Sequence, residues 1–201
     1  MDQKYIISEF YDFKADKSFI KESEEQKKTI VLSGILQKAN TLNKNGRVYP
    51  YPILKREVER YMQEVDNDSA LGELNHPDSA VVDLNNVCIK VIDMWWENEV
   101  LYGKIEVLDE RLDCARRLVG LLMSDVRIGI SSRGVGSVKN IKGQDVVQED
   151  FELIAFDIVS NPSTPGAYMF KESKGWGMTP LDEWISKTNG TYKRKENRQI
   201  L

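Results

Sequence analysis

The strongest constraint on the fold of this chain is an acid placed inside an apolar run. Leu153-Ile154-Ala155-Phe156-Asp157-Ile158-Val159 is apolar at odd and even positions alike, which is typical of a strand buried on both faces. A buried carboxylate without a partner is costly to keep. Asp157 must therefore be paired, lie near the exposed end of its strand, or serve a chemical task.

Two explanations fit Asp157 equally well on chemistry alone. A structural ion pair could form with Arg127, with Arg133 or with a lysine. Alternatively, the carboxylate could orient an imidazole by accepting its Nδ1 proton and stabilising the imidazolium. The residues leave both explanations open.

The remaining pattern predicts a mainly β domain with surrounding helices, an α+β fold. The strand candidates share apolar and β-branched residues, and they are 29–36, 87–95, 100–107, 126–138 and 146–158. Two segments have one apolar helical face, namely 50–65, which opens on Pro50 and Pro52, and 109–123. We expect these elements to form one domain over residues 29–170.

Both ends of the chain differ from this domain. Residues 1–28 include the charged run 21–28 and predict a flexible N-terminal extension. Residues 171–201 predict a C-terminal extension with a short helix at 181–187 and a basic tail at 193–198.

Composition and charge exclude several classes of function. The formal net charge of −4 gives no reason to expect nucleic acid or an anionic membrane as the main partner, and no apolar run is long enough to span a bilayer. A single histidine and two distant cysteines, Cys88 and Cys114, cannot build a multi-histidine or tetrahedral zinc site. We therefore expect no metal or cofactor. The lone cysteines, and an N-terminus without the layout of a secretion signal, favour a cytoplasmic protein.

The single histidine, His76, lies between Asn75 and Pro77 in a predicted loop. An imidazole suits a general base because it titrates near physiological pH. Taken alone, a surface histidine at a turn is the more common explanation.

A second candidate is the segment Gly129–Ser137, where Ser131 and Ser132 end an apolar strand and run into glycines. Small residues let a substrate approach the backbone, and their N–H groups can stabilise an oxyanion. A glycine-rich strand with a bulge explains the same residues equally well. The segment lacks the lysine of a phosphate-binding loop and does not read as the strand-to-helix elbow of hydrolases.

Three short motifs occur in order: Gly72-Glu73-Leu74-Asn75-His76-Pro77, Ile92-Asp93-Met94-Trp95-Trp96 and Gly129–Ser137. Together they resemble the prohead core proteases of large contractile-tailed phages, over roughly residues 34–167. The resemblance implies a fold like the assemblin proteases of herpesviruses, a mostly antiparallel β-barrel surrounded by helices. It also implies a serine protease.

Carried over to this sequence, the resemblance makes His76 the base and Ser131 the nucleophile. Ser132 is the alternative, because neighbouring strand residues point to opposite faces and only one can meet His76. Arg133 and the N–H of Gly134 are expected to hold the oxyanion or a bridging water.

The third member of the site departs from the herpesvirus pattern, which uses a second histidine that this chain lacks. A carboxylate must then orient the imidazole. Asp157 is favoured, because Asp78 and Asp83 lie in a polar loop where a solvated acid needs no explanation.

The resemblance also implies the substrates, which are scaffold or core proteins and the major capsid protein, cut after glutamate in Leu/Ile-x-Glu sites. The setting would be the assembling prohead in the host cytoplasm, where the protease self-associates. Self-cleavage is implied as well, and matching triplets in the two extensions end at Glu9, Glu22 and Glu183. We expect removal of one or both extensions to regulate activity or release.

Two other functions are weighed against a protease. The first is a catalytically inactive scaffold or core-assembly protein of the same fold. The second is a nucleic-acid-associated assembly factor using the basic tail, but a handful of charges and Tyr192 make a weak footprint.

Overall fold

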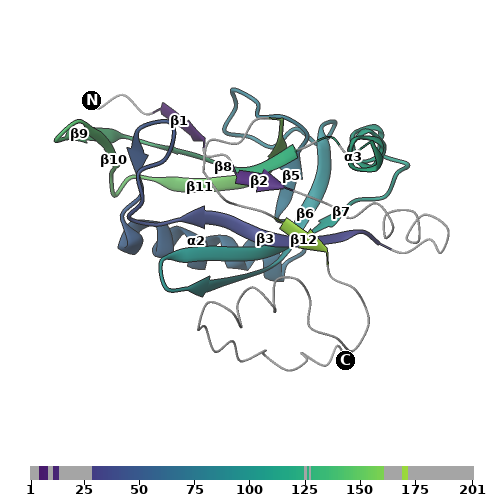
Figure 1. The fold of residues 1–201 in the computed structure, drawn as a ribbon, viewed down its shortest axis with the longest axis horizontal. Coiled ribbons are helices and arrows are strands. Elements are labelled where there is room, and N and C mark those ends of the chain that lie inside the picture. The colour runs from purple at the N-terminus through teal and green to yellow at the C-terminus, as the bar shows by residue number, and fades with distance from the viewer. Residues whose placement is uncertain are drawn as a thin grey trace.

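The computed structural model describes residues 5–8, 11–13, 29–124, 126, 128–160 and 169–171 (Figure 1). Its helices are α2 (Tyr51–Asp66) and α3 (Asp113–Met123). Its strands are β1 (Tyr5–Ser8), β2 (Tyr11–Phe13), β3 (Val31–Lys38), β4 (Arg47–Val48), β5 (Leu71–Glu73), β6 (Val87–Glu97), β7 (Val100–Val107), β8 (Ile128–Gly136), β9 (Val138–Ile141), β10 (Gln144–Val147), β11 (Glu152–Val159) and β12 (Met169–Lys171). The predicted mainly β fold with surrounding helices is confirmed.

The strands form three sheets. The largest has the order β12-β3-β7-β6-β5, a second has the order β1-β8-β11 with β2 also paired to β8, and a small third sheet has the order β4-β10-β9. All pairings are antiparallel except that of β4 with β10.

The prediction of a closed barrel is wrong, because the sheets do not join into one continuous ladder. Between the two larger sheets, the described strands are linked by a single isolated bridge, which pairs Leu74 with Ile158 in parallel. A single bridge does not continue the hydrogen-bonded ladder around a barrel. The two sheets instead pack through their apolar side chains.

The hydrophobic core lies between these sheets and the helices. α2 packs on β6 and β11 through Leu54, Val58 and Tyr61, which recur at helical spacing on its buried face. The Tyr61 ring meets Phe156 of β11 edge to face, with centroids 5.6 Å apart. Such a pair adds about 0.5–1.5 kcal/mol beyond simple burial. This packing fixes the position of β11 against α2.

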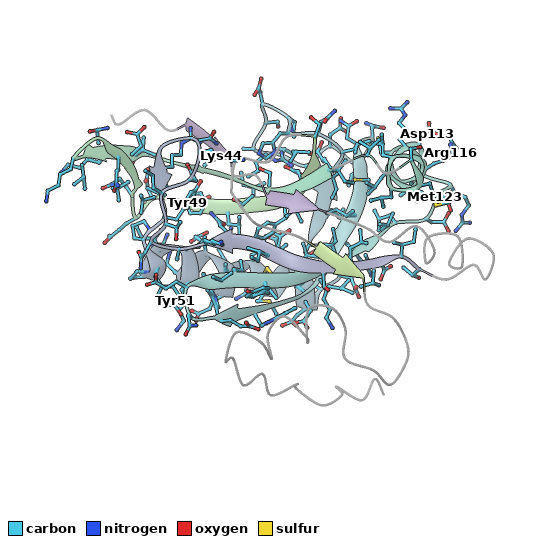
Figure 2. The ribbon with its side chains drawn as sticks, in the orientation of Figure 1. Lys44, Tyr49, Tyr51, Asp113, Arg116 and Met123 are labelled. Atoms are coloured by element: carbon cyan, nitrogen blue, oxygen red, sulfur yellow. The ribbon has the colours of Figure 1, made fainter. Side chains whose placement is uncertain are left out.

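α3 begins at Asp113, whereas the sequence pattern predicted a start at 109. Asp109 accepts hydrogen bonds from the backbone N–H and from Nε of Arg111, both over 2.8 Å, and this local turn competes with a helical conformation. Figure 2 shows Asp113 and Arg116 on the outer side of α3, where they form an exposed ion pair.

The long strands predicted at 126–138 and 146–158 are each divided in two. Asp150 is the reason, since its Oδ1 accepts the N–H of Ser137 over 3.0 Å and the Ser137 hydroxyl over 2.9 Å. Opposite this break, the Phe151 N–H bonds back to Gln148 O and forms a turn. The sheet of β8 and β11 is thereby separated from the small hairpin β9–β10.

The termini join the sheets at three places. β1 and β2, which belong to the predicted N-terminal extension, pair with β8, and β12 pairs with β3. Glu9, Glu22, Glu183, the predicted helix at 181–187 and the basic tail lie outside the described residues. No helix in the described part of the chain is long and apolar enough to cross a membrane.

Candidate active site

The pairing of β8 with β11 sets the first two functional side chains. Ser131 is directly opposite Asp157, and Ser132 is opposite Phe156. Directly opposed residues project from the same face of a sheet, and successive residues project from opposite faces. Ser131 and Asp157 therefore share one face, while Ser132 and Phe156 share the other.

His76 is brought to the same face by the segment that follows β5. After the Leu74–Ile158 bridge, Asn75 adopts a φ of +72° and donates its N–H to Ile158 O over 2.7 Å. Asparagine tolerates this left-handed conformation better than most residues. The turn places His76 beside the last residues of β11.

A glycine makes this approach possible. A Cβ at position 72 would collide with the backbone oxygen of Phe156 and would lie 2.8 Å from Ile89 Cγ1. Gly72 thus allows β5 to pack against β11 closely enough for the following turn to reach Asp157.

The three side chains form one hydrogen-bonded row. His76 Nδ1 lies 2.7 Å from Asp157 Oδ2, and Ser131 Oγ lies 3.2 Å from His76 Nε2. A carboxylate can only accept when ionised, so Nδ1 carries the proton and Nε2 is left to accept from the hydroxyl. Hydroxyl, imidazole and carboxylate in this order can activate a nucleophile.

Burial differs along the row. Ser131 and Asp157 are fully buried, whereas 13% of the His76 side chain is exposed. The arrangement therefore has one solvent-facing member, the imidazole.

Arg133 lies two residues beyond Ser131 and projects from the same face. Its Nε donates to Asp157 Oδ2 over 2.8 Å, and its Nη2 donates to Glu73 Oε1 over 2.8 Å and lies 3.3 Å from Asp157 Oδ1. Its Nη1 lies 2.7 Å from Ser79 O and 3.5 Å from Val81 O. Every guanidinium nitrogen thus has an acceptor within the protein.

These contacts do not support the predicted oxyanion role of the Arg133 side chain. The guanidinium is fully buried and is committed to two carboxylates and two carbonyl groups. The ion pair and the imidazole contact, which the sequence offered as alternatives for Asp157, occur together.

Comparisons with known proteins identify the family of this chain. A family model described as prohead core protein serine protease matches residues 13–174. The chain belongs to this family. The prohead core protein protease of Enterobacteria phage T4 is 36% identical over 143 residues, which cover 70% of this chain and 68% of the relative.

A solved structure has the same fold. The bacteriophage T4 capsid assembly protease superposes with a TM-score of 0.70 at 28% identity, covering 80% of this chain and 100% of the other. By family and by fold, the chain is a peptidase.

Glu73 is a neighbour of this row of side chains that the sequence reasoning missed. It is buried, it accepts from Arg133 Nη2 and from the N–H of Asp83, and its own N–H donates to Asp157 Oδ1 over 3.0 Å. In the sequence it appeared only within the motif Gly72–Pro77, without a chemical role. Its position in the motif of His76, three residues before the histidine, was the available signal.

Ser132 and Gly134 lie away from the row. The Ser132 hydroxyl is buried and has no hydrogen-bond partner among the described residues. A Cβ on Gly134 would lie 2.6 Å from Glu152 O and would also collide with the Phe151 ring, so packing alone requires this glycine. Its N–H stays a predicted oxyanion donor.

Of the other acids considered, Asp83 has its carboxylate bonded within its own loop, where it accepts from the backbone N–H of Asn85 over 2.9 Å. Arg127, considered as an ion-pair partner of Asp157, lies outside the described residues.

Within the described ranges, no group of three or more histidine, cysteine, aspartate or glutamate side chains could hold a metal ion.

Proposed function

We propose that this protein is a serine endopeptidase of phage capsid maturation, with Ser131 as nucleophile, His76 as general base and Asp157 as the group that orients the imidazole. The observation that carries the proposal is the row of two contacts, 3.2 Å from Ser131 Oγ to His76 Nε2 and 2.7 Å from His76 Nδ1 to Asp157 Oδ2. An inactive scaffold of the same fold would have no need of this row.

The chemistry follows from the tautomer. Asp157 holds the Nδ1–H, so Nε2 accepts the proton of Ser131 as Oγ attacks the substrate carbonyl carbon. Nε2–H then protonates the leaving amine, which releases the first product and leaves an acyl group on Ser131. Water, activated by the same nitrogen, hydrolyses the acyl group and restores the hydroxyl.

Buried charged groups adjoin the imidazole. Two acidic side chains, Asp157 and Glu73, bond one basic side chain, Arg133. The carboxylate of Asp157 also contacts His76 Nδ1, so it can stabilise the imidazolium that forms when Nε2 takes the Ser131 proton.

Arg133 and Glu73 act through Asp157. Arg133 Nε donates to the Asp157 carboxylate and fixes its orientation. Glu73 accepts from Arg133 Nη2, and its own backbone N–H donates to Asp157 Oδ1. We propose that both are positioning residues, because their contacts are with Asp157 and with each other.

The substrates proposed are the scaffold or core proteins of the prohead and the major capsid protein, cut after glutamate in Leu/Ile-x-Glu sites inside the assembling prohead. The names of the two T4 relatives support a role in capsid assembly. The cleavage motif, self-association and self-cleavage rest on the family resemblance and on the triplets in the sequence.

The deciding experiment compares full-length wild type with Ser131→Ala and Ser132→Ala on a peptide that contains one Leu-x-Glu site. A matched peptide with glutamine in place of glutamate is the control. We expect wild type and Ser132→Ala to cut only the glutamate peptide, and Ser131→Ala to cut neither. Cleavage by Ser131→Ala would contradict the role of Ser131 as nucleophile. A wild type that cuts neither peptide, even after residues 1–13 are digested away, would favour the inactive scaffold.

A further inference from the structure

The pairing of β8 with β11 contains one irregularity, and it lies between the start of β11 and the proposed active site. Leu153 is opposite Gly134, but the next pair along the ladder joins Ala155 to Arg133. Ile154 is therefore an extra residue on β11, which makes this point a β-bulge.

The bulge determines which side chain meets Ser131. In an unbroken ladder that continued from the pair at Leu153, Phe156 would lie opposite Ser131, and Asp157 would lie opposite Ile130. Asp157 would then project from the other face of the sheet, because neighbouring strand residues point to opposite faces. With the bulge in place, Asp157 lies opposite Ser131. The row of proposed catalytic side chains therefore depends on the extra residue.

On the β8 side, the start of β11 is fixed by two glycines. A Cβ at position 134 would lie 2.3 Å from Phe151 Cε2, and a Cβ at position 136 would lie 2.8 Å from Phe151 Cα. Gly134 and Gly136 thus leave the space that Phe151 fills, as glycine in a strand does where another backbone approaches closely. This contact resists a change of register in the segment before the bulge, so loss of the bulge would move the segment after it.

On the opposite edge, the start of β11 is bonded by charged side chains of α2. Glu57 Oε2 accepts the N–H of Leu153 over 3.0 Å, and Arg60 Nη2 donates to Leu153 O. Arg56 Nη2 donates to Phe151 O over 3.0 Å. We call Arg56, Glu57 and Arg60 the α2 clamp. Both backbone groups of Leu153, the last paired residue before the bulge, are held by this clamp.

Glu57 is the central member of the α2 clamp. Its side chain is buried, and it accepts from Arg56 Nε over 3.0 Å and from Arg60 Nε over 2.9 Å. One carboxylate thus orients the two guanidinium groups that bond the carbonyl groups of β11. Loss of Glu57 would release both arginines and leave the N–H of Leu153 without its acceptor.

The same helix also contacts β11 beyond the bulge. One turn after Glu57, the Tyr61 ring packs edge to face on Phe156, the neighbour of Asp157. A single helix therefore fixes β11 on both sides of Ile154. Since the two contacts belong to one rigid element, they maintain the extra residue between them.

We propose that Glu57 is a positioning residue for the reaction. It fixes Leu153 to α2 and so maintains the bulge, and the bulge places Asp157 opposite Ser131. The inference rests on the proposed function, to which it adds a group outside the row. It assigns a role to a buried acid and two arginines that the proposed mechanism does not use.

The first test reads the imidazole directly, in the full chain labelled with ¹⁵N-histidine and carrying no histidine tag. His76 is the single histidine, so its two ring nitrogens give the only signals. At a pH where the ring is neutral, wild type should show the proton on Nδ1, the atom that contacts Asp157. Glu57→Leu removes every acceptor at this position and should show a mixture of both tautomers.

Two further variants complete this test. Glu57→Gln can still accept from the N–H of Leu153, so its signals should lie between those of wild type and Glu57→Leu. Glu59→Gln is the matched control, because Glu59 is an exposed acid of the same helix that pairs with Lys55 over 3.9 Å. It should give the wild-type signals. Wild-type signals in folded Glu57→Leu would overturn the inference.

The second test measures cleavage of the Leu-x-Glu peptide. Misplacement of a catalytic group by about 1 Å can lower a rate about 100-fold, so Glu57→Leu should lower kcat by about this factor and leave KM unchanged. An unchanged kcat, or a change confined to KM, would contradict a positioning role. Arg60→Met should act in the same direction, and its half-exposed side chain makes it the variant to use if Glu57→Leu does not fold.

The two tests separate the inference from the proposed function. A wild type that cuts no peptide would overturn the proposed function, but the histidine signals would still report whether Glu57 positions Asp157. An active wild type whose kcat and histidine signals do not respond to Glu57→Leu would overturn the inference alone.

The third test removes the need for the bulge. Deletion of Ile154 makes the pairs at Leu153 and Ala155 successive members of a regular ladder, with Asp157 still opposite Ser131. We expect the deletion alone to keep the wild-type histidine signals, and the deletion combined with Glu57→Leu to restore them. A combined variant that stays impaired would show that Glu57 does not act through the bulge.

Discussion

Arg133 and Asp157 form a buried ion pair in which Nε donates to Oδ2 over 2.8 Å, with no exposed surface on either side chain. The same oxygen lies 2.7 Å from His76 Nδ1. One carboxylate atom thus serves the structural pair and the imidazole at once. Any change in the pair is transmitted to the tautomer and orientation of the base.

Removal of Arg133 should destabilise the fold strongly. Arg133→Met leaves the carboxylates of Asp157 and Glu73 buried without their shared partner, and breaking a buried pair in this way costs about 3–5 kcal/mol. The free energy of unfolding in urea measures the loss. Arg111→Met is the control, because that arginine bonds Asp109 on the surface and should change stability little.

Arg133→Lys separates positioning from folding. A lysine keeps the positive charge but cannot make the planar fork that bonds Asp157 and Glu73 together. We expect a folded protein with a lower kcat and an unchanged KM on the Leu-x-Glu peptide. A change confined to KM would mean that Arg133 acts on substrate binding and not through Asp157.

Asp157→Asn should leave the chain folded but nearly inactive. The amide no longer holds the Nδ1–H, so the imidazole can adopt the wrong tautomer. In Ser-His-Asp proteases this change lowers kcat about 10⁴-fold. Asp83→Asn is the matched control, since Asp83 bonds Asn85 within its own loop. Near-normal kcat in Asp157→Asn would transfer the orienting role to another group.

The sequence predicted the members of the row but not the means by which they meet. His76, Ser131 and Asp157 were chosen from motifs and from the cost of a buried acid. The register that places Ser131 opposite Asp157 depends on side-chain packing between β8 and β11, which a sequence pattern of period two does not specify. The same register puts Ser131, and not Ser132, on the face of Asp157, which favours Ser131 in the choice that the sequence left open.

Local hydrogen bonds account for most of the other differences. The late start of α3 depends on the Asp109–Arg111 turn, and the division of the long strands depends on Asp150, so neither is visible in hydrophobic periodicity. Glu73 was overlooked because its partner, Arg133, is 60 residues away in sequence. The expected barrel was carried over from distant relatives and failed because, among the described strands, a single bridge joins the two larger sheets.

Gly72 should be essential for the position of His76. In Gly72→Ala the new methyl group collides with backbone of β11, which cannot give way as a side chain can, and overpacking of this kind costs about 1–3 kcal/mol. We expect lower stability and lower kcat together. Gly120→Ala is the control, since nothing lies near its Cβ on α3, and it should stabilise the chain by about 0.5–1 kcal/mol. Equal effects of the two substitutions would contradict the close approach of β5 to β11.

The two thiols should take no part in the reaction. Cys88 is fully buried, and burial, with smaller contributions from Cys114 and the acidic site residues, raises the pKa of its thiol far above the usual range. The nucleophilic thiolate is therefore scarce at neutral pH and increases only as the pH rises. Iodoacetamide should leave the folded protein active and unlabelled, as intact mass and peptide cleavage would report. The control is the same protein in urea, where Cys88 and Cys114 should both react. Loss of activity in step with alkylation of the folded chain would point to a cysteine nucleophile and against Ser131.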